Sequence, residues 1–345
     1  MIGIVSYGFY VPHYRIKVEE IAQMWGRDPQ EIKKSLHITE KAVAAADEDA
    51  VTMAYQSAAM ALDGTSINKE EIGCMFFGSE SFPYAVKPAA TIVAEWLGIG
   101  HHYLAYDTQF ACKAGTGALI SALAMVGAGK ITYGLVCAGD KGTARPQDLL
   151  EYTAGSGANA WLVGDKEVIL EVIATYSFSS DTPDFWRGIK SDYPSYTGRF
   201  TGQPAYFHHV GTAAKNLMAK QALTPNDFAY AVFHMPNGKF PLQVGLSLGF
   251  SEKQVTPSLV VNQLGNSYSA SSLMGLAAVL DEAKAGDKIL FVSYGSGAGS
   301  DAFIFQVTRH LKKQRKSLKK QIQQKKYINY PTYLKYMDII HEGSL

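Results

Sequence analysis

The sequence predicts an α/β protein whose chain contains two similar halves. Short apolar runs bounded by Gly, Asp or Ser alternate with longer segments of helical pattern, which is typical of α/β folds with buried sheets. A repeated arrangement is the second observation: in each half a polar residue follows a strand, at 80 and 234, and another precedes a small-residue helix, at 112 and 266. Such self-similarity indicates a tandem duplication.

The individual elements follow from these patterns. Apolar runs predict strands at 2–8, 74–79, 131–139, 158–164, 168–176, 230–234, 288–295 and 302–308. The longer segments predict helices at 50–63, 88–97, 113–127, 205–222, 239–248 and 270–284. We divide the chain into a first half at 1–166, a second half at 167–308, and a basic and aromatic tail at 309–345.

Composition excludes several classes of function. The 345 residues are 47% hydrophobic and 18% charged, with a formal net charge of +1, so nothing favours nucleic acid as a partner. The three cysteines, Cys74, Cys112 and Cys137, form neither a disulfide framework nor a C-x-x-C pair, which fits a reducing cytoplasm. The N-terminus lacks a signal-peptide pattern and no run of eighteen apolar residues occurs. We therefore expect a cytoplasmic protein without membrane association.

Two other sequence patterns, glycine-rich stretches and paired histidines, lack the neighbouring residues that a binding site of their kind needs. The glycine-rich stretches at 155–160 and 295–300 run into strand-like residues rather than a helix, which argues against a dinucleotide site. The adjacent histidines at 101–102 and 208–209 lack the i, i+4 spacing of a helical zinc site. We expect no metal site.

Four polar residues at matching places in the two halves carry the functional prediction. Cys112 precedes a small-residue helix, whose N-terminus would lower the pKa of the thiol and favour a thiolate nucleophile. Taken singly, each residue has an ordinary structural explanation: Cys112 as a small buried hydrophobe, His234 as a hydrogen-bonding partner, Asn266 as a helix cap and Glu80 as a solvated loop carboxylate. Their joint occurrence favours one shared catalytic cleft.

The same residues lie in motifs that resemble a known family, the 3-hydroxy-3-methylglutaryl-CoA synthases of the thiolase superfamily, in their shorter prokaryotic and archaeal form. The resemblance covers roughly residues 2–308. It is carried by "GSES" with Glu80, "FACKAGT" with Cys112, "EYTAGSGA" (151–158), "DFWR" (184–187), "FHMPNGK" (233–239), "GNSYSAS" (265–271) and "SYGSGAGS" (293–300). It implies a five-layer αβαβα thiolase-like fold, a homodimer, and an active site at the bottom of a CoA tunnel.

The resemblance also implies a reaction and roles. Acetyl-CoA, acetoacetyl-CoA and water give HMG-CoA and CoA, for the mevalonate (isoprenoid) route, with CoA thioesters as substrates and no further cofactor. Cys112 takes the acetyl group, Glu80 removes a methyl proton, and protonated His234 supplies the acid. Asn266 orients His234 or the acetoacetyl thioester carbonyl.

Further positions are implied as substrate contacts. Lys239 suits a phosphate or pantetheine contact, although a solvated surface lysine is the alternative. The hydroxyl-bearing substrate contacts are Thr153, Thr201 and Ser296. Where many relatives carry an arginine shortly after the lysine, this chain has Gln243, which puts one phosphate contact in doubt.

Two rival functions share parts of the pattern. A ketoacyl-acyl-carrier-protein synthase of type III also uses Cys, His and Asn, but its decarboxylating condensation needs no base where Glu80 stands. A catalytically inactive scaffold would be expected to have lost a catalytic residue, and none is missing. Glu80 and "DFWR" favour the synthase.

The tail shows a different composition. Residues 309–326 are rich in Lys and Arg without an acid, and 327–340 are rich in Tyr and apolar side chains. A solvated basic helix is the ordinary interpretation of the first part. The aromatic part suggests an exposed docking segment, because archaeal relatives are associated with an acetoacetyl-CoA thiolase and a DUF35 zinc-ribbon/OB-fold protein.

Overall fold

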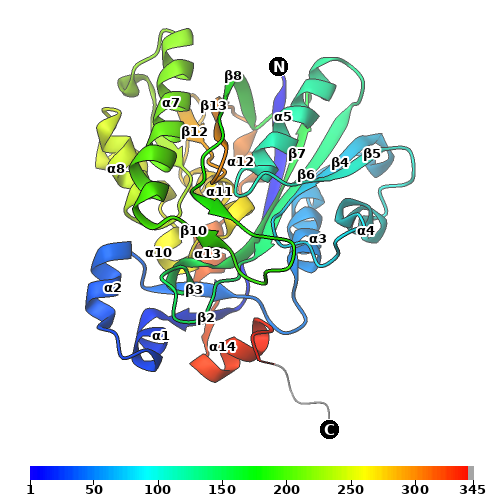
Figure 1. Cartoon of the computed structure of the whole chain (residues 1–345). Helices are drawn as coiled ribbons and strands as arrows, with labels where there is room; N and C mark the ends of the chain where they lie inside the picture. Colours follow the sequence, from blue (N-terminus) through cyan, green and yellow to red (C-terminus); the bar gives the residue numbers. More distant parts are fainter. Residues whose placement is uncertain (341–345) are drawn as a thin grey trace.

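A nine-stranded sheet forms the centre of the molecule, and the computed structural model describes it within residues 1–340. Its order is β11-β12-β13-β8-β1-β7-β6-β4-β5 (Figure 1). The strands are β1 (Gly3–Tyr10), β4 (Ile72–Gly78), β5 (Leu104–Thr108), β6 (Tyr133–Lys141), β7 (Ser156–Gly164), β8 (Leu170–Ser179), β11 (Tyr230–Phe233), β12 (Lys288–Val292) and β13 (Gly299–Val307).

The strand order repeats about the junction of β1 and β8. In the first half β4 runs parallel to β6, and β6 antiparallel to β7; in the second half β11 runs parallel to β12, and β12 antiparallel to β13. The halves meet where Gly3 and Ile4 pair with Glu171 and Leu170. This repeat agrees with a duplication, and the boundary that we place after residue 166 falls between β7 and β8.

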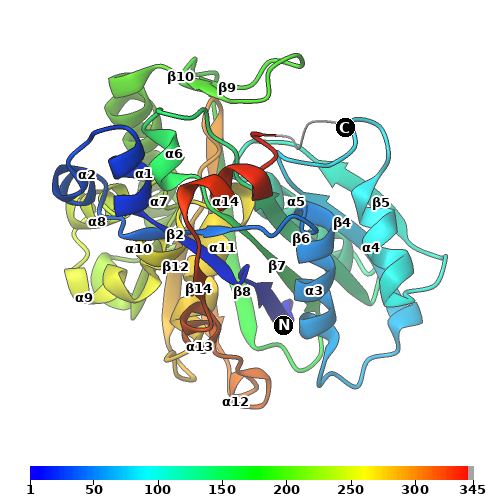
Figure 2. The same ribbon diagram turned by 90° about the horizontal axis from the view of Figure 1, so that it is seen from below.

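Helices form three layers around the two half-sheets (Figures 1 and 2). On β4, Met75 and Phe77 pack with one outer layer, whereas Cys74 and Phe76 face the middle layer, as the two-residue period of a strand requires. The outer layers are α3 (Ala50–Leu62) with α4 (Ala89–Leu97), and α7 (His208–Lys220) with α8 (Phe240–Ser247); the middle layer is α5 (Ala114–Gly127) with α11 (Ser271–Leu280). The five-layer αβαβα prediction is confirmed.

The middle layer explains the small residues after position 112. Every residue of α11 is buried, which is the pattern of a helix enclosed on all sides. On α5, a Cβ added to Gly115 would lie 2.4 Å from Ala138 Cβ. Small side chains therefore let α5 pack closely onto β6.

Several elements were not predicted from the sequence. The helix expected at 205–222 starts with a π-helical segment, Gly202–Phe207, before α7. Beside the cavity described below, a second sheet has the order β14-β2-β3. The remaining elements are β2 (Tyr14–Lys17), α1 (Val18–Met24), α2 (Pro29–Leu36), β3 (Glu40–Val43), α6 (Leu150–Thr153), β9 (Phe185–Trp186), β10 (Ser195–Tyr196), α9 (Glu252–Val255), α10 (Val261–Leu264), α12 (Leu311–Gln314), α13 (Leu318–Gln323), β14 (Lys326–Tyr327) and α14 (Tyr330–Tyr336), with short 3₁₀ turns between them.

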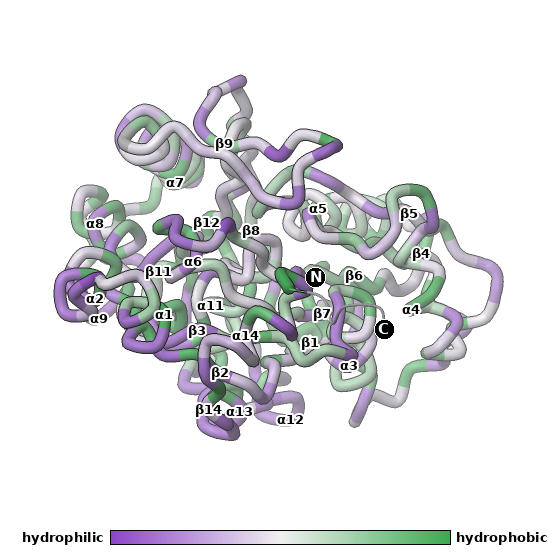
Figure 3. The backbone as a smooth tube through the Cα atoms, turned by 60° about the horizontal axis from the view of Figure 1, so that its bottom comes forward, coloured by the Kyte–Doolittle hydropathy of each residue, from purple (hydrophilic) through white to green (hydrophobic). Residues whose placement is uncertain are grey.

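The C-terminal tail folds back on the body (Figure 2). Its basic part forms the short helices α12 and α13 rather than one solvated helix, and its hydrophilic colour stands out in Figure 3. Its aromatic part is not exposed throughout: Tyr330, Tyr333 and Met337 are buried in the main core, whereas Tyr327 and Ile340 are 45% and 43% exposed. The expected exposure therefore holds for only part of this stretch, since hydropathy alone does not reveal which surface covers an aromatic residue.

No helix within residues 1–340 combines the length and apolar character needed to cross a membrane.

Candidate active site

A cavity of about 490 Å³ brings together seven of the eight side chains that the sequence analysis names as catalytic or substrate-binding. It lies between the two halves: Cys112 and Thr153 come from the first, and His234, Asn266 and Ser296 from the second. Thr201 and Lys239 line it as well. Glu80 does not line this cavity but reaches it through Cys112. The structure therefore brings Cys112, His234 and Asn266 to one cavity and places Glu80 in contact with Cys112.

Cys112 and Glu80 form a direct pair. The Cys112 thiol donates to Glu80 Oε1 across 3.1 Å, and Cys112 is only 3% exposed. Before it, Ala111 has φ = +43°, a conformation that is uncommon for a side-chain-bearing residue and that marks functional turns.

The electrostatics of Cys112 differ from the sequence-based expectation. Burial, and then the charge of Glu80, raise the pKa of the thiol well above its ordinary value. The expected lowering by a helix N-terminus was wrong because α5 begins only at Ala114 while an acid lies in contact. The thiol thus needs a base to become a nucleophile, and the carboxylate in contact with it is Glu80.

Glu80 is held in an acidic, enclosed setting. Burial, and then the charge of Asp140, raise its pKa to about 8. Asp140 fixes the loop that carries Glu80, since it accepts hydrogen bonds from Glu80 N at 2.8 Å, Ser79 Oγ at 2.6 Å and Ser81 Oγ at 2.7 Å. Asp140 was missed by the sequence reasoning, although it ends a predicted strand in a Gly-Asp turn.

A small pocket of about 20 Å³ lies on the far side of Glu80. Glu80 and Tyr268 line it together with Lys141, Thr143 and Arg187. Arg187 also donates to Glu80 O at 3.0 Å, which places the arginine of the "DFWR" motif directly behind the carboxylate. The pocket has room for about one water molecule among polar groups.

His234 occupies a dry position at the end of β11. It is fully buried, and neither ring nitrogen has a hydrogen-bond partner in the described part of the chain. Its backbone is fixed by Tyr206, whose hydroxyl donates to His234 O at 2.7 Å. Burial lowers the pKa of the imidazole to about 3. Burial therefore favours the neutral imidazole of His234, whereas the resemblance implied the protonated form.

Asn266 lines the cavity without touching His234 through a hydrogen bond in residues 1–340. Its Oδ1 accepts from Tyr268 N at 2.9 Å, and its backbone N donates to Thr153 O at 2.6 Å. These bonds leave the side-chain amide nitrogen available to the cavity. The geometry favours a direct contact of Asn266 with substrate over the orientation of His234.

The segment that carries Ser296 is tied down by Asp184 of the "DFWR" motif. The buried Asp184 carboxylate accepts from Tyr294 Oη at 2.8 Å and from Gly297 N at 2.8 Å. Gly297 has φ = +89°, a conformation that favours glycine. The "DFWR" motif therefore contacts two loops of the site. Asp184 binds the loop that carries Ser296, and Arg187 binds the loop that carries Glu80.

The mouth of the cavity is polar and cationic. Lys239 is exposed at the start of α8, and Gln243 lies one turn further along the same helix. Across from them, Ser35 and Leu36 of α2 complete the rim. The sequence reasoning missed α2 altogether, because its short amphipathic pattern carries no motif.

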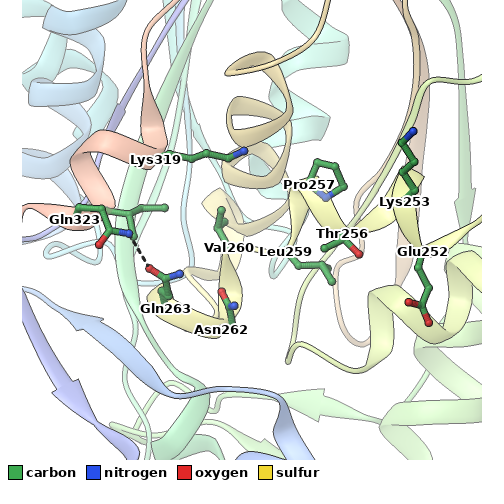
Figure 4. Close-up of a pocket in the computed structure, with 11 residues that line it drawn as sticks. Glu252, Lys253, Thr256, Pro257, Leu259, Val260, Asn262, Gln263, Lys319 and Gln323 are labelled. Carbon is green, nitrogen blue, oxygen red and sulfur yellow. Dashed lines mark hydrogen bonds between the residues drawn. The ribbon is translucent and has the colours of Figure 1, made fainter.

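A larger pocket of about 720 Å³ lies elsewhere, between α9, α10 and α13 (Figure 4). Its lining includes Gln263 and Gln323, which are joined by a hydrogen bond, and the side chain of Lys319. It contains neither a cysteine nor a histidine. Reactive side chains, rather than volume, therefore identify the candidate site. Within residues 1–340, no group of three or more His, Cys, Asp or Glu side chains is arranged to hold a metal ion.

Known proteins share this sequence and arrangement. The chain is 54% identical over 338 residues to the hydroxymethylglutaryl-CoA synthase of Archaeoglobus fulgidus, covering 97% of this chain and 98% of that protein. It is 50% identical over 337 residues to the hydroxymethylglutaryl-CoA synthase of Methanopyrus kandleri, covering 97% and 96%. The C-terminal family of 3-oxoacyl-[acyl-carrier-protein] synthase III matches residues 218–307.

Two solved structures have a fold similar to that of this chain. A crystal structure described as an HMG-CoA synthase complexed with CoA aligns with a TM-score of 0.90 at 27% identity, covering 97% of this chain and 90% of that one. A structure of MvaS in complex with 3-hydroxy-3-methylglutaryl coenzyme A has a TM-score of 0.88 at 24% identity, covering 97% and 91%. The second match supports the fold alone.

Proposed function

The chain belongs to the hydroxymethylglutaryl-CoA synthase family and is a hydroxymethylglutaryl-CoA synthase, and we propose which residues of the cavity perform the reaction. Acetyl-CoA, acetoacetyl-CoA and water are converted to HMG-CoA and CoA. The observation that carries the assignment is the buried Cys112–Glu80 contact beside a cavity that His234 also lines. A nucleophile, a base and an imidazole thus converge where two thioesters must react.

The first step is acetyl transfer to Cys112. Glu80 takes the thiol proton, and the sulfur attacks the carbonyl carbon of acetyl-CoA. The proton then passes from Glu80 to the sulfur of CoA, which leaves as a thiol, and Glu80 is ionised again. A thioester exchanges for a thioester, so little bond energy changes and cysteine suits the task. Backbone N–H groups near Cys112 and Ser296 are the proposed donors to the oxyanion.

The second step makes the carbon–carbon bond. Glu80 removes a proton from the methyl group of acetyl-Cys112, and the carbanion attacks the ketone carbon of acetoacetyl-CoA. A carboxylate whose pKa is raised to about 8 is well matched to this role near neutral pH. The acid in this step is His234, which is neutral at rest. Its N–H donates a hydrogen bond to the ketone oxygen and passes this proton to the alkoxide as the carbon–carbon bond forms. The ring then regains a proton through water from Glu80, which took it from the methyl group, so that both side chains return to their starting forms.

Hydrolysis completes the cycle. Water attacks the thioester of Cys112, which releases HMG-CoA and restores the thiol. While CoA fills the main cavity, the small pocket behind Glu80 is the proposed source of this water, since it has room for about one molecule.

The rim of the cavity is the proposed site for the CoA chain. Lys239 supplies a positive charge for phosphate, and the hydroxyls of Thr153, Thr201 and Ser296 contact the substrate. Gln243 stands where it can contribute a neutral hydrogen bond but no charge.

We also propose how the enzyme assembles. β5 pairs only with β4 within the described residues, which leaves one strand edge open, and Trp96 and Leu104 are about half exposed beside it (51% and 50%). An open apolar edge favours pairing with a second copy, in a homodimer. A complex with an acetoacetyl-CoA thiolase and a DUF35 protein remains a proposal from the resemblance, as does the cytoplasmic location, which the three unpaired cysteines support.

Mass spectrometry tests the assignment of the nucleophile. After exposure to acetyl-CoA alone, the peptide that contains Cys112 should gain one acetyl group. The Cys112→Ala variant should form no adduct and no HMG-CoA. The control is Cys137→Ala, at a buried cysteine of β6 that packs against the outer layer, and it should still be acetylated at position 112. An adduct on another residue, or turnover by Cys112→Ala near the wild-type rate, would contradict the proposal.

A further inference from the structure

The C-terminal helix α14 lies behind the wall of the active-site cavity. That wall includes Leu150 and Thr153 of the short helix α6, whose side chains line the cavity. None of the tail residues 309–340 lines the cavity itself. Contacts between α14 and α6 are therefore contacts to the back of the site (Figure 2).

A buried carboxylate joins the tail to this wall. Glu151 of α6 is fully buried, and its Oε1 accepts a hydrogen bond of 2.6 Å from the Tyr330 hydroxyl. Its Oε2 accepts from Trp25 Nε1 at 2.9 Å and from Gln147 N at 2.8 Å. The Glu151 side chain thus links the end of α1, helix α14 and the segment before α6. Both of its buried oxygens accept hydrogen bonds.

A buried lysine makes the second link. Lys41 Nζ donates to Glu151 O and, at 3.1 Å, to the Tyr333 hydroxyl, and it lies 4.5 Å from the centre of the Tyr333 ring. Lys41 is 1% exposed. The backbone of α6 and the aromatic face of α14 are therefore held by one ammonium group.

The wall continues directly to Asn266. Asn266 N donates to Thr153 O at 2.6 Å, and Gly155 N donates to Asn266 O at 2.9 Å. A displacement of α6 would carry both Thr153 and Asn266 with it, whereas Cys112 and Glu80 are fixed by α5 and by Asp140.

We propose that the C-terminal tail positions the acetoacetyl side of the active site, with Tyr330 and Tyr333 as positioning residues that act through Glu151 and Lys41 on Thr153 and Asn266. This inference rests on the proposed function, to which it adds that Thr153 and the side-chain amide of Asn266 contact acetoacetyl-CoA in the condensation step. It assigns the tail a role in the second half-reaction and none in acetyl transfer.

The test is Tyr330→Phe, with Tyr336→Phe as the matched control. Phe at 330 keeps the ring that packs edge-on against Trp25 at 5.9 Å and removes only the donor to Glu151. Tyr336 lies in the same helix but its ring packs on Tyr14 at 5.1 Å, away from α6. Both variants are assayed for acetyl-Cys112 formation, for condensation at varied acetoacetyl-CoA, and for thermal unfolding.

We expect Tyr330→Phe to acetylate Cys112 within about twofold of wild type, and to lose about tenfold in kcat/KM for acetoacetyl-CoA, the size typical of a lost hydrogen bond to a charged group. Tyr336→Phe should match wild type in both steps. Tyr333→Phe, which removes the acceptor for Lys41, should show the same split.

Three results separate the alternatives. Equal losses in both steps, tracking a lower unfolding temperature, would overturn the inference because a purely structural role predicts that pattern. Wild-type condensation by folded Tyr330→Phe and Tyr333→Phe would overturn it as well. Failure of the wild-type enzyme to form acetyl-Cys112 would instead overturn the proposed function on which the inference rests.

Discussion

Replacing Glu80 with Gln separates the two half-reactions. Gln keeps the size of the side chain and an oxygen beside the Cys112 thiol, but it cannot take a proton. Burial and then the charge of Glu80 raise the pKa of the Cys112 thiol in the wild type, so the variant loses the base for acetyl transfer but also the charge that opposes a thiolate. Acetyl-Cys112 should therefore form more slowly than in the wild type, and it should accumulate because carbon–carbon bond formation stops.

The expected magnitude follows from the surroundings of Glu80. Loss of a positioned general base costs ~10²–10⁴-fold, and we expect the upper end because the neighbouring carboxylate of Asp140 is already engaged. One oxygen of Asp140 accepts from the Ser79 hydroxyl, and the other accepts from Ser269 N at 2.9 Å and Ser269 Oγ at 2.6 Å. Asp140 cannot take over as the base without breaking these bonds.

The pH dependence gives a second measure. Glu80 has its pKa raised to about 8, so about a tenth of it is ionised at pH 7 and about nine tenths at pH 9. The rate of wild-type condensation should rise about tenfold from pH 7 to pH 9. The rate of Glu80→Gln should not show this rise.

Three assays check the prediction: mass spectrometry of the acetyl-enzyme, loss of the acetoacetyl-CoA enolate absorbance, and exchange of acetyl hydrogens with deuterated solvent. Glu80→Gln should keep the adduct and lose the other two signals. Condensation by this variant at an undiminished rate, or use of a malonyl carrier protein by the wild type, would refute the reasoning and favour a ketoacyl synthase.

Two further predictions concern the condensation step and the rim that is proposed to bind CoA. His234→Ala should still form acetyl-Cys112 but lose ~10²-fold or more in condensation, because the imidazole acts on the ketone oxygen; a quenched-flow comparison of the two steps checks this, and impaired acetylation with normal condensation would reverse the assigned roles. Gln243→Arg should lower the KM for both CoA substrates by up to about tenfold through a charge-assisted phosphate contact. Lys239→Gln should raise the KM values. Unchanged KM values in both variants would contradict a phosphate contact at this rim.

The sequence determined the elements whose patterns are local. Strands such as β6 and helices such as α3 appear within a few residues of the predicted ranges. The reason is that apolar residues recur every second position in a strand and about every 3.6 positions in a helix, and this spacing is visible in the sequence. The duplication and the choice of four polar residues as candidates also came from the sequence, since residue type and order need no coordinates. Short elements without a motif, such as α1 and α2, were missed for the complementary reason.

The tertiary structure decided the charge states and the role of the tail. Cys112 looked like a thiolate beside a helix start, yet the pKa of its thiol is raised because a carboxylate from a distant loop lies 3.1 Å away. Tyr330 looked like a docking residue, yet its hydroxyl meets Glu151, far away in the chain. Both properties depend on desolvation and on partners brought together from distant parts of the chain, and burial of that kind is fixed only when the layers pack.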